Sequence, residues 1–350
     1  MSYEYEKVET PGEGLRLHLN ENTDGCSPAV IAVLQRLTRQ QAAFYPDYDE
    51  VTAACAARLG VTTDRVILTN GLDEGILAAS FVALGGGSSD RRPEAVIVVP
   101  AFDMYAAYAD VAGGRIVEVP ADRDFGFPLQ KVLDAIGERT RLVWLTNPNN
   151  PSGQVIPRSA ILEIAAAAAP RALVVVDEAY ADFSGETLLD DDSLDRFPNL
   201  VVGRTFAKAY GLAALRAGAL VARPDTLAPM RRVVPPYSLN ICAALALPAA
   251  LADQAYFGWY LDQVEESKTL LYDTFDRLRI RFWKSAANFV LARFGEDTSR
   301  VVRGLAERRV FVRDKSSDPA CVGCVRITAG VVEHTRVAIA ALEEVLCGAA

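Results

Sequence analysis

Short β-branched runs alternate with helical segments between residues 65 and 222, and this alternation constrains the fold more than any other feature. The runs are, in chain order, RVILT, AVIVV, RIVEV, RLVWLT, ALVVVD, LVVG and GALVA. Strands separated by helices are typical of a largely parallel sheet that helices cover on both faces. The intervening segments agree, since residues 71–87 give a helical pattern ending in glycines and the alanine-rich 158–169 stops at Pro170.

The pattern changes after Pro235 and Pro236, which indicates a second structural unit. Long helical segments at about 240–280 precede the strand-like runs NFVLARF, RRVFVRD and CVRIT and a closing helix. A chain of 350 residues also exceeds the usual size of a single core. We therefore expect an α/β fold with a large domain, residues 41–255, and a smaller α+β domain, residues 1–40 and 256–350.

Composition excludes several classes of function. Lys and Arg number 36 against 45 Asp and Glu, and the resulting charge of −9 is a poor match to nucleic acid or to an anionic membrane surface. The most apolar windows are strand-length and far shorter than the ~20 residues of a membrane helix. The acidic, polar N-terminal residues 1–14 lack the layout of a secretory signal, so we expect a cytoplasmic protein.

The six cysteines predict neither a disulfide framework nor a metal site. Cys321 and Cys324 form a single C-x-x-C, and the only histidines are His18 and His334. A structural zinc ion needs four ligands, and one such spacing is a weak motif. We expect reduced thiols and no bound metal.

Polar clusters follow four of the predicted strands. RLVWLT leads into NPNNPSG, ALVVVD into EAYADF, LVVG into RTFAK, and RVILT into NGLDEG. In open α/β sheets the ligand crevice lies at the carboxyl ends of the strands, so amides, an acid, a phenol and a lysine should meet there. No G-x-G-x-x-G follows a strand, which argues against a dinucleotide.

Two residues of this cluster suggest pyridoxal 5'-phosphate (PLP). Asp177 can cap the next helix, or it can pair with the protonated ring nitrogen that makes this cofactor an electron sink. Lys208 stands among Phe206, Ala207 and Ala209, where it can extend to solvent or remain inside as a reactive amine. Only an unprotonated amine attacks the cofactor aldehyde, and an apolar frame lowers a lysine pKa.

The cofactor phosphate would need an anion site beside these residues. Arg216, Thr205 and the backbone amides that open a helix at Gly71, Leu72 and Asp73 can supply one. Helix N-termini and guanidinium groups both bind anions well. The sequence therefore predicts a PLP site at this edge of the sheet.

Several motifs resemble those of a known enzyme family. NPNNPSG, VVVDEAY, RTFAKAYGLAALRAG and CVRITAG are similar to the motifs of fold type I PLP-dependent aminotransferases. LHLNEN, FYPDYD, GLDEGI and AFDMY resemble its histidinol-phosphate aminotransferase branch, and the match runs from Leu17 to about Leu346. The resemblance implies the fold type I architecture, a homodimer, an amino donor and an oxo-acid acceptor.

The resemblance also implies roles for the matched residues around the cofactor. Lys208 would condense with the cofactor aldehyde and move the proton at the substrate Cα, while Asp177 would hold the ring nitrogen. Asn150 and Tyr180 would hydrogen-bond the ring oxygen. Tyr105 would lie against the ring face.

Three more residues match positions that bind phosphate or substrate. Tyr45 is similar to a tyrosine that reaches the cofactor phosphate from the other subunit of a dimer. Arg326 matches the arginine that receives the acidic end of the substrate, and Arg313 resembles a second basic residue associated with substrate phosphate. Taken alone, Tyr45 and Tyr105 would be surface or core aromatics, and Arg313 a solvated charge.

The chain departs from the family pattern at two positions. Ala207 stands where the family usually has a serine that helps to hold the cofactor phosphate. Asp24 stands where the branch typically has a tyrosine that contacts the substrate phosphate. A carboxylate facing a phosphate would weaken binding, and it would suit an amino or guanidino group better, unless its loop turns it outward.

These observations predict a PLP-dependent aminotransferase acting on histidinol phosphate or a closely related amino donor with 2-oxoglutarate. The alternatives within the cofactor class are an aromatic or other amino-acid aminotransferase and a decarboxylase of a phosphorylated amino acid. A ligand-sensing regulator would need an attached basic DNA-binding segment, and the residues before Leu19 contain only Lys7 and Arg16 as strong bases. A scaffold with a silent site is disfavoured because the reactive residue types are all present.

Overall fold

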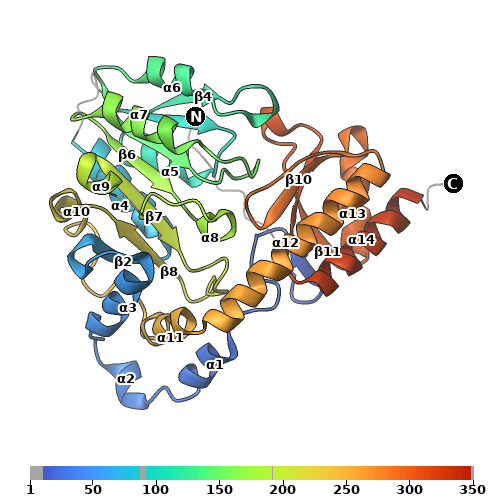
Figure 1. The fold of residues 1–350 in the computed structure, drawn as a ribbon, viewed down its shortest axis with the longest axis horizontal. Coiled ribbons are helices and arrows are strands. Elements are labelled where there is room, and N and C mark those ends of the chain that lie inside the picture. The colour runs from blue at the N-terminus through green and yellow to red at the C-terminus, as the bar shows by residue number, and fades with distance from the viewer. Residues whose placement is uncertain (1–10, 87–91, 191, 348–350) are drawn as a thin grey trace.

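The computed structural model describes residues 11–86, 92–190 and 192–347 and contains two β-sheets (Figure 1). The larger sheet has seven strands in the order β2-β8-β7-β6-β5-β3-β4. β8 runs antiparallel to both neighbours, and all other pairs are parallel. The strands are β2 (Val66–Asn70), β3 (Glu94–Val99), β4 (Arg115–Pro120), β5 (Thr140–Thr146), β6 (Leu173–Asp177), β7 (Leu200–Thr205) and β8 (Ala217–Val221). The seven predicted strands and the largely parallel α/β sheet are confirmed.

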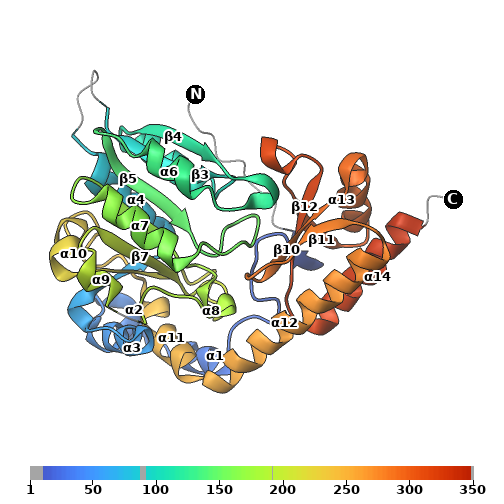
Figure 2. The ribbon, with the colours of Figure 1, turned by 45° about the horizontal axis from the view of Figure 1, so that its top comes forward.

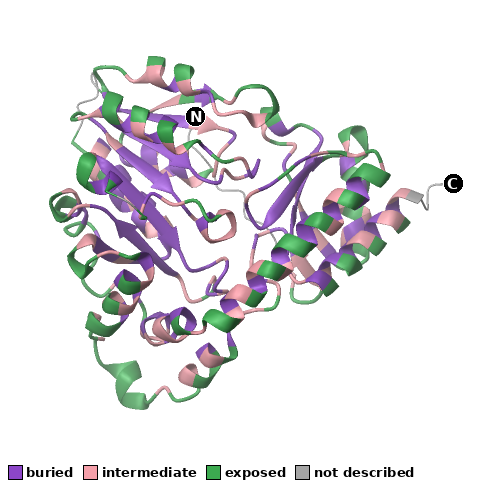
Figure 3. Ribbon diagram, viewed as in Figure 1, coloured by how far each residue is buried: buried purple, intermediate pink, exposed green. Residues whose placement is uncertain are grey.

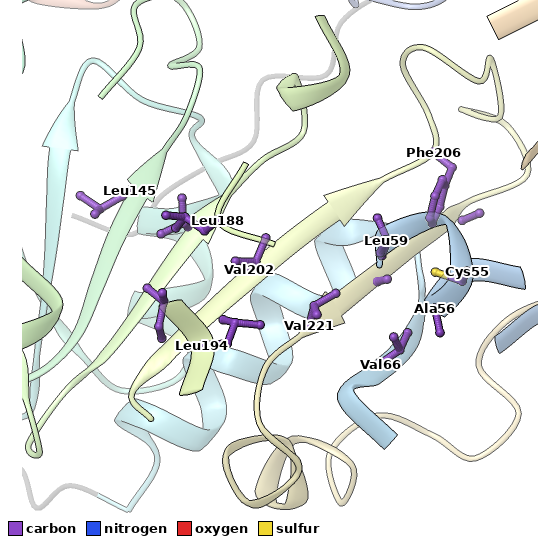
Figure 4. Close-up of a cluster of buried hydrophobic side chains, with 14 of the residues drawn as sticks. Cys55, Ala56, Leu59, Val66, Leu145, Leu188, Leu194, Val202, Phe206 and Val221 are labelled. Carbon is purple, nitrogen blue, oxygen red and sulfur yellow. The ribbon is translucent and has the colours of Figure 1, made fainter. Parts of the chain in front are cut away.

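The larger sheet is buried on both faces, which explains its nearly continuous apolar runs. In β5, Val143 and Leu145 belong to one apolar core, while Leu142 and Trp144 belong to the other, as the period of two along a strand requires. Figure 3 shows these strands as a buried band between helices with exposed outer surfaces. Figure 4 shows the first core, where Leu145 and Val202 lie among side chains from neighbouring strands and helices.

Helices cover the two faces unequally. One face packs against α4 (Leu72–Leu84), α5 (Met104–Val111) and α10 (Pro224–Met230). The other packs against α3 (Asp49–Leu59), α6 (Leu129–Ala135), α7 (Arg158–Ala168), α9 (Ser193–Arg196) and α11 (Ile241–Ala252). The short α8 (Ala181–Ser184) follows the end of β6. The helices predicted within residues 71–87 and 158–169 are confirmed as α4 and α7.

The smaller sheet has five strands in the order β1-β11-β12-β10-β9. They are β1 (Leu15–Leu17), β9 (Arg281–Trp283), β10 (Phe289–Arg293), β11 (Val310–Asp314) and β12 (Cys324–Thr328). β1 pairs with β11 in parallel and the other pairs are antiparallel. The helices α12 (Gln254–Arg277), α13 (Thr298–Glu307) and α14 (Val332–Cys347) cover one face of this sheet and leave the other turned away from them (Figure 2).

Long helix α12 runs from α11, beside the larger sheet, to the smaller sheet (Figures 1 and 2). The N-terminal segment is shared between the two regions, because β1 joins the smaller sheet while α1 (Pro28–Leu34) packs against α11. The short α2 (Arg39–Ala43) follows α1. The division into domains at residues 40 and 255 stays a prediction. Among the described residues no single helix meets the length and apolarity that a membrane span requires; α11 and α12 meet it only as a pair, bent by 78°.

Candidate active site

The carboxyl ends of β5, β6 and β7 lie side by side at one edge of the larger sheet. Thr146 is the register partner of Asp177, and Asp177 is the register partner of Gly203. Because these strands are parallel, their last residues and the loops that follow open on the same crevice. Thr146, Asp177 and Thr205 line a cleft there.

The cleft brings together predicted residues that are up to 254 positions apart in the chain, from Leu72 to Arg326. All of the predicted site residues line it except Tyr45 and Asp24. Those that line it are Leu72, Asp73, Tyr105, Asn150, Asp177, Tyr180, Thr205, Lys208, Arg216, Arg313 and Arg326. The larger sheet provides one side of the cleft, and β11 and β12 of the smaller sheet provide the other.

Lys208 projects from the segment that follows β7 and is partly buried. Its Nζ donates a hydrogen bond of 2.9 Å to the Leu19 carbonyl and lies 6.0 Å from the centre of the Tyr180 ring. Burial, the largest cause, and the charge of Arg326 together lower the pKa of Lys208 to about 8, against the opposing effect of Glu21. At pH 7 an amine with this pKa is neutral in about one molecule in ten, far more often than an ordinary lysine.

Asp177 ends β6 and is buried. The Tyr105 hydroxyl donates to its Oδ2 at 2.6 Å, and the Ala179 amide donates to its Oδ1 at 2.8 Å. Burial raises the pKa of Asp177 to about 6, although both hydrogen bonds lower it. In the described part of the chain no basic side chain forms an ion pair with this carboxylate. The acid can therefore accept a cation that a ligand brings.

Tyr105 is hydrogen-bonded to Asp177, a contact that the sequence did not indicate. Its hydroxyl accepts a hydrogen bond of 3.0 Å from Thr146, in addition to the one it donates to Asp177. Its ring stacks on Trp144, with 4.9 Å between ring centres and 12° between planes. The contact of Tyr105 with a cofactor ring stays a prediction.

The start of α4 has the features of an anion-binding site. Gly71 precedes the helix, and within the described residues no side chain caps its first amides, so those N–H groups can donate to a ligand. Arg216 lies over this helix end and donates to Asp73 Oδ2 at 2.6 Å. Gly71 has a φ of +76°, a conformation that favours glycine, and a Cβ atom there would lie 2.4 Å from Arg216 Nη2. Thr205 and Ala207 line the same cleft, and Ala207 adds no hydroxyl donor.

Arg326 lies on the opposite side of the cleft and is buried. Its Nη1 donates to Asn150 Oδ1 at 2.5 Å, and its Nη2 donates to the His18 carbonyl at 2.8 Å. Its Nε is buried and has no hydrogen-bond acceptor among the described residues. Burial lowers the pKa of Arg326, and the charge of Arg313 lowers it as well. A buried guanidinium with an unused donor can accept a carboxylate or phosphate ligand.

Two predicted site residues do not line the cleft. Tyr45 is 80% exposed and stacks on Tyr237, with 4.3 Å between ring centres. The Asp24 carboxylate accepts a hydrogen bond of 3.0 Å from the Tyr256 hydroxyl on α12. The structure therefore turns Asp24 away from the cleft, which is the outward orientation that removes a carboxylate from the substrate site.

Some residues that line the cleft were not predicted from the sequence. Asn20 is almost completely buried, and its amide donates to the Tyr180 hydroxyl at 3.0 Å. The Thr328 hydroxyl donates to Asn20 Oδ1 at 3.2 Å, which fixes the orientation of that amide. Lys315 also lines the cleft. Asn20 belongs to the LHLNEN motif, and Lys315 lies two positions beyond Arg313. Their positions in the sequence could therefore have identified both as candidate site residues.

The cleft thus combines uncapped helix amides beside Arg216, a buried acid with no basic ion-pair partner in the described part of the chain, and an amine that is partly neutral. This donor set fits a ligand that carries a phosphate and a protonated ring nitrogen and reacts with an amine. The model of the family "Aminotransferase class I and II" matches residues 13–342. The chain belongs to this family.

Individual relatives agree with this assignment. The aminotransferase is 35% identical over 340 residues to a histidinol-phosphate aminotransferase of Moorella thermoacetica, covering 95% of this chain and 85% of that protein. It is 36% identical over 344 residues to histidinol-phosphate aminotransferase 2 of Ralstonia nicotianae, covering 96% and 89%. The structure of histidinol-phosphate aminotransferase from Sinorhizobium meliloti in complex with PLP matches with a TM-score of 0.87 at 27% identity, over 96% of this chain and 92% of that one.

PLP is the cofactor of this aminotransferase family, and the chemistry of the cleft fits it. When bound, the cofactor supplies an electron sink for the negative charge that develops at the substrate Cα. The anion site at the start of α4 suits its phosphate, and Asp177 suits its protonated nitrogen. An amino donor and an oxo-acid acceptor are the substrates of such an enzyme.

Proposed function

We propose that this aminotransferase transfers the amino group of histidinol phosphate to 2-oxoglutarate. The observation that carries the proposal is the register of the smaller sheet, which sets Arg313 directly opposite Arg326 at the cleft. Two guanidinium groups side by side at the cleft suit an anionic group of a substrate. The names of the relatives support histidinol phosphate as the donor that brings the anion.

Lys208 and Asp177 would perform the two central tasks. In its neutral form, Lys208 Nζ would take the proton from the substrate Cα and move it between that carbon and the cofactor. In its ionised form, Asp177 would hold the proton of the ring nitrogen, while Tyr105 and Ala179 keep the carboxylate in place. Exclusion of water by these buried groups strengthens both interactions.

The neighbouring polar groups would orient the cofactor and the substrate. Tyr180 receives a hydrogen bond from Asn20, so its own hydroxyl proton remains available for the cofactor ring oxygen, with Asn150 as the second partner. Arg216, Thr205 and the open amides of Leu72 and Asp73 would hold the phosphate. Arg326 would receive the acidic end of the substrate, assisted by Arg313.

A panel of amino donors with 2-oxoglutarate tests the function. The purified enzyme should use histidinol phosphate with a much higher kcat/KM than phenylalanine or a basic amino acid. A preference for phenylalanine would assign the enzyme to aromatic amino-acid transamination instead. Release of carbon dioxide without consumption of 2-oxoglutarate would show that it is a decarboxylase of a phosphorylated amino acid.

We also propose a cytoplasmic homodimer in which Tyr45 reaches the site of the neighbouring subunit. The exposure of Tyr45 and of its stacking partner Tyr237 supports this, because adjacent exposed aromatics are typical of interfaces. Free thiols at the five described cysteine side chains fit a reducing compartment. Mixing inactive Lys208→Ala and Tyr45→Ala subunits should restore activity, since one site of the hybrid then has both native residues. Sedimentation as a monomer would refute the dimer.

A further inference from the structure

A buried arginine lies in the larger sheet outside the cleft. Among the residues that the structure describes, two arginines are buried: Arg326, which lines the cleft, and Arg204, which does not. Arg204 belongs to β7 and lies on the same face of the sheet as Val202 in the first core, whereas its neighbour Thr205 lines the cleft. Arg204 therefore does not face a ligand in the cleft, and its burial needs another explanation.

Arg204 contacts both ends of the turn that carries Tyr180, residues 178–182. Its Nη1 donates to Glu178 Oε2 at 3.2 Å, and its Nη2 donates to Asp182 Oδ1 at 2.7 Å. The two acids stand two positions before and two positions after the tyrosine, and their side chains are buried. A single planar guanidinium thus fixes two points of this turn relative to β7.

Glu178 is held by further contacts as well. The Thr187 hydroxyl donates to its carboxylate at 2.6 Å, and the Leu188 N–H donates to it at 2.7 Å. Its backbone N–H donates to the Gly203 carbonyl at 2.9 Å, next to Arg204 in β7. The following residue, Ala179, supplies one of the two hydrogen bonds to the buried acid of the cleft. The geometry of this turn therefore also affects how that acid is held.

The same charged cluster reaches the segment that carries the reactive lysine. Arg58 of α3 places its Nη2 3.7 Å from Asp182 Oδ1, and its Nε donates to the Tyr210 hydroxyl at 2.7 Å. Tyr210 is buried and follows Lys208 by two positions. The cluster therefore joins the turn 178–182 to the turn after Lys208, two segments that follow different strands of the sheet.

Stabilisation of the fold does not by itself explain these buried charges. Taking an ion pair out of water is costly, and well-packed apolar residues of similar volume often stabilise a protein as well or better. Apolar packing is non-directional, however, whereas hydrogen-bonded charges fix orientation. Orientation matters here because Lys208 Nζ lies only 6.0 Å from the centre of the Tyr180 ring, and both side chains line the cleft.

We propose that Arg204 is a positioning residue that holds the turn 178–182, and with it the Tyr180 hydroxyl, in the place where it meets the cofactor ring. The inference rests on the role proposed above for Tyr180, and it does not depend on which amino donor the enzyme uses. Tyr180 would contact the cofactor and not the substrate. A small displacement of its hydroxyl should therefore lower kcat and leave the KM nearly unchanged.

Kinetics of three variants test the positioning role. Arg204→Lys keeps the charge but lacks the planar fork that reaches two carboxylates, and Glu178→Gln keeps the size of one partner while removing its charge. With the best donor of the panel, Arg204→Lys should lower kcat about 10- to 100-fold and change the KM by less than about twofold. Glu178→Gln should lower kcat less. Arg65→Lys is the control, because Arg65 forms an exposed ion pair with Asp195, and it should match the native enzyme.

The absorbance of the bound cofactor gives a readout that a merely structural role would not change. A hydrogen bond donated by Tyr180 favours negative charge on the ring oxygen and thus the deprotonated form of the cofactor. The pH at which the visible absorbance changes should therefore rise by about one unit in Arg204→Lys, and in the same direction in Tyr180→Phe. Arg204→Lys should add little to Tyr180→Phe, since both act through one hydroxyl.

Three results would overturn the proposal. A folded Arg204→Lys enzyme with native kcat and a native absorbance midpoint would show that Arg204 only stabilises the fold, whatever its melting temperature. Equal effects of Arg204→Lys in the native and Tyr180→Phe enzymes would show that it acts through another group. A native midpoint in Tyr180→Phe would refute the role of Tyr180 and, with it, this inference.

Two other failures can be distinguished from failure of the Arg204 assignment. If Arg204→Lys does not fold, Glu178→Gln replaces it in each comparison, and native kcat and midpoint in that variant would refute the proposal. If the native enzyme does not use histidinol phosphate, the absorbance midpoints are unaffected, because they are measured on the bound cofactor without a donor. A raised midpoint in Arg204→Lys would then still support the positioning role.

Discussion

The two sides of the cleft differ in how their charges are balanced. At the edge of the larger sheet, Lys208 and Asp177 have opposite charges, and their pKa values of about 8 and about 6 lie on either side of neutrality. On the smaller sheet, Arg313, Lys315 and Arg326 carry one sign only. The first side holds an acid and a base in positions fixed by hydrogen bonds, whereas the second holds three cations.

The acid and the amine at the larger sheet are already held in place without a ligand. Asp177 is held by Tyr105 and Ala179, and Lys208 is held by the Leu19 carbonyl, so both groups are positioned before anything binds. Preorganised groups of this kind act on the transition state without costly rearrangement. On the other side, Arg326 is held by Asn150 and the His18 carbonyl, and its unused Nε suits an anionic group of the substrate.

The largest effect should come from removing the reactive amine. Lys208→Ala should lower kcat by at least roughly 10² to 10⁴-fold, because the group that we propose moves the Cα proton is lost. It should also abolish the visible absorbance that arises when the lysine is covalently joined to PLP. Lys284→Ala is the matched control and should retain both properties. Substantial turnover by Lys208→Ala would place the chemistry elsewhere.

The pH dependence of cofactor attachment tests whether the pKa of Lys208 is lowered. Since the pKa of Lys208 is about 8, its neutral form decreases as the pH falls below 8. The rate at which PLP joins the cofactor-free protein should therefore fall by roughly tenfold per pH unit below pH 7 and level off above about pH 9. Rapid-mixing absorbance at several pH values would measure it.

A substitution on the other side of the cleft sharpens this pH experiment. Arg326→Gln removes a positive charge that lowers the Lys208 pKa, so the midpoint of the rate profile should move to higher pH. Such a shift would show that the two sides of the cleft are electrostatically coupled. A native midpoint near the ordinary lysine value of roughly 10.4 would instead contradict the burial of this amine.

Much of the fold could be predicted because local patterns specify it. The seven strands of the larger sheet are short apolar runs between helical segments, and their parallel arrangement places Asp177 and Lys208 at one edge. By contrast, β1 and β9 have three residues each and lack a strand-length apolar run. β1 forms by pairing with a distant strand, as in the register of Leu15 with Val310, and no local pattern indicates such a contact. β9 forms by pairing with β10, the next strand in the chain.

The site likewise combines residues that the sequence predicts with contacts that it does not indicate. The residue types that PLP chemistry requires are readable from sequence, and Lys208 and Asp177 stand out there for that reason. The contacts of Tyr105 with Asp177 and of Asn20 with Tyr180 join residues 72 and 160 positions apart. Such pairs depend on how sheets, helices and loops pack, so they appear only in three dimensions.

The smallest effect should come from substitution of Asp24, and a result of little or no change would itself be informative. From sequence, this carboxylate would repel a substrate phosphate, but in the structure it accepts a hydrogen bond from Tyr256 and does not line the cleft. Asp24→Asn should therefore change the KM for histidinol phosphate by less than about twofold, since a solvent-exposed charge outside the cleft is well screened. Kinetics at low and moderate salt would measure it. A fall in KM of tenfold or more would show that Asp24 does face the phosphate during binding, and that its loop turns inward when the substrate arrives.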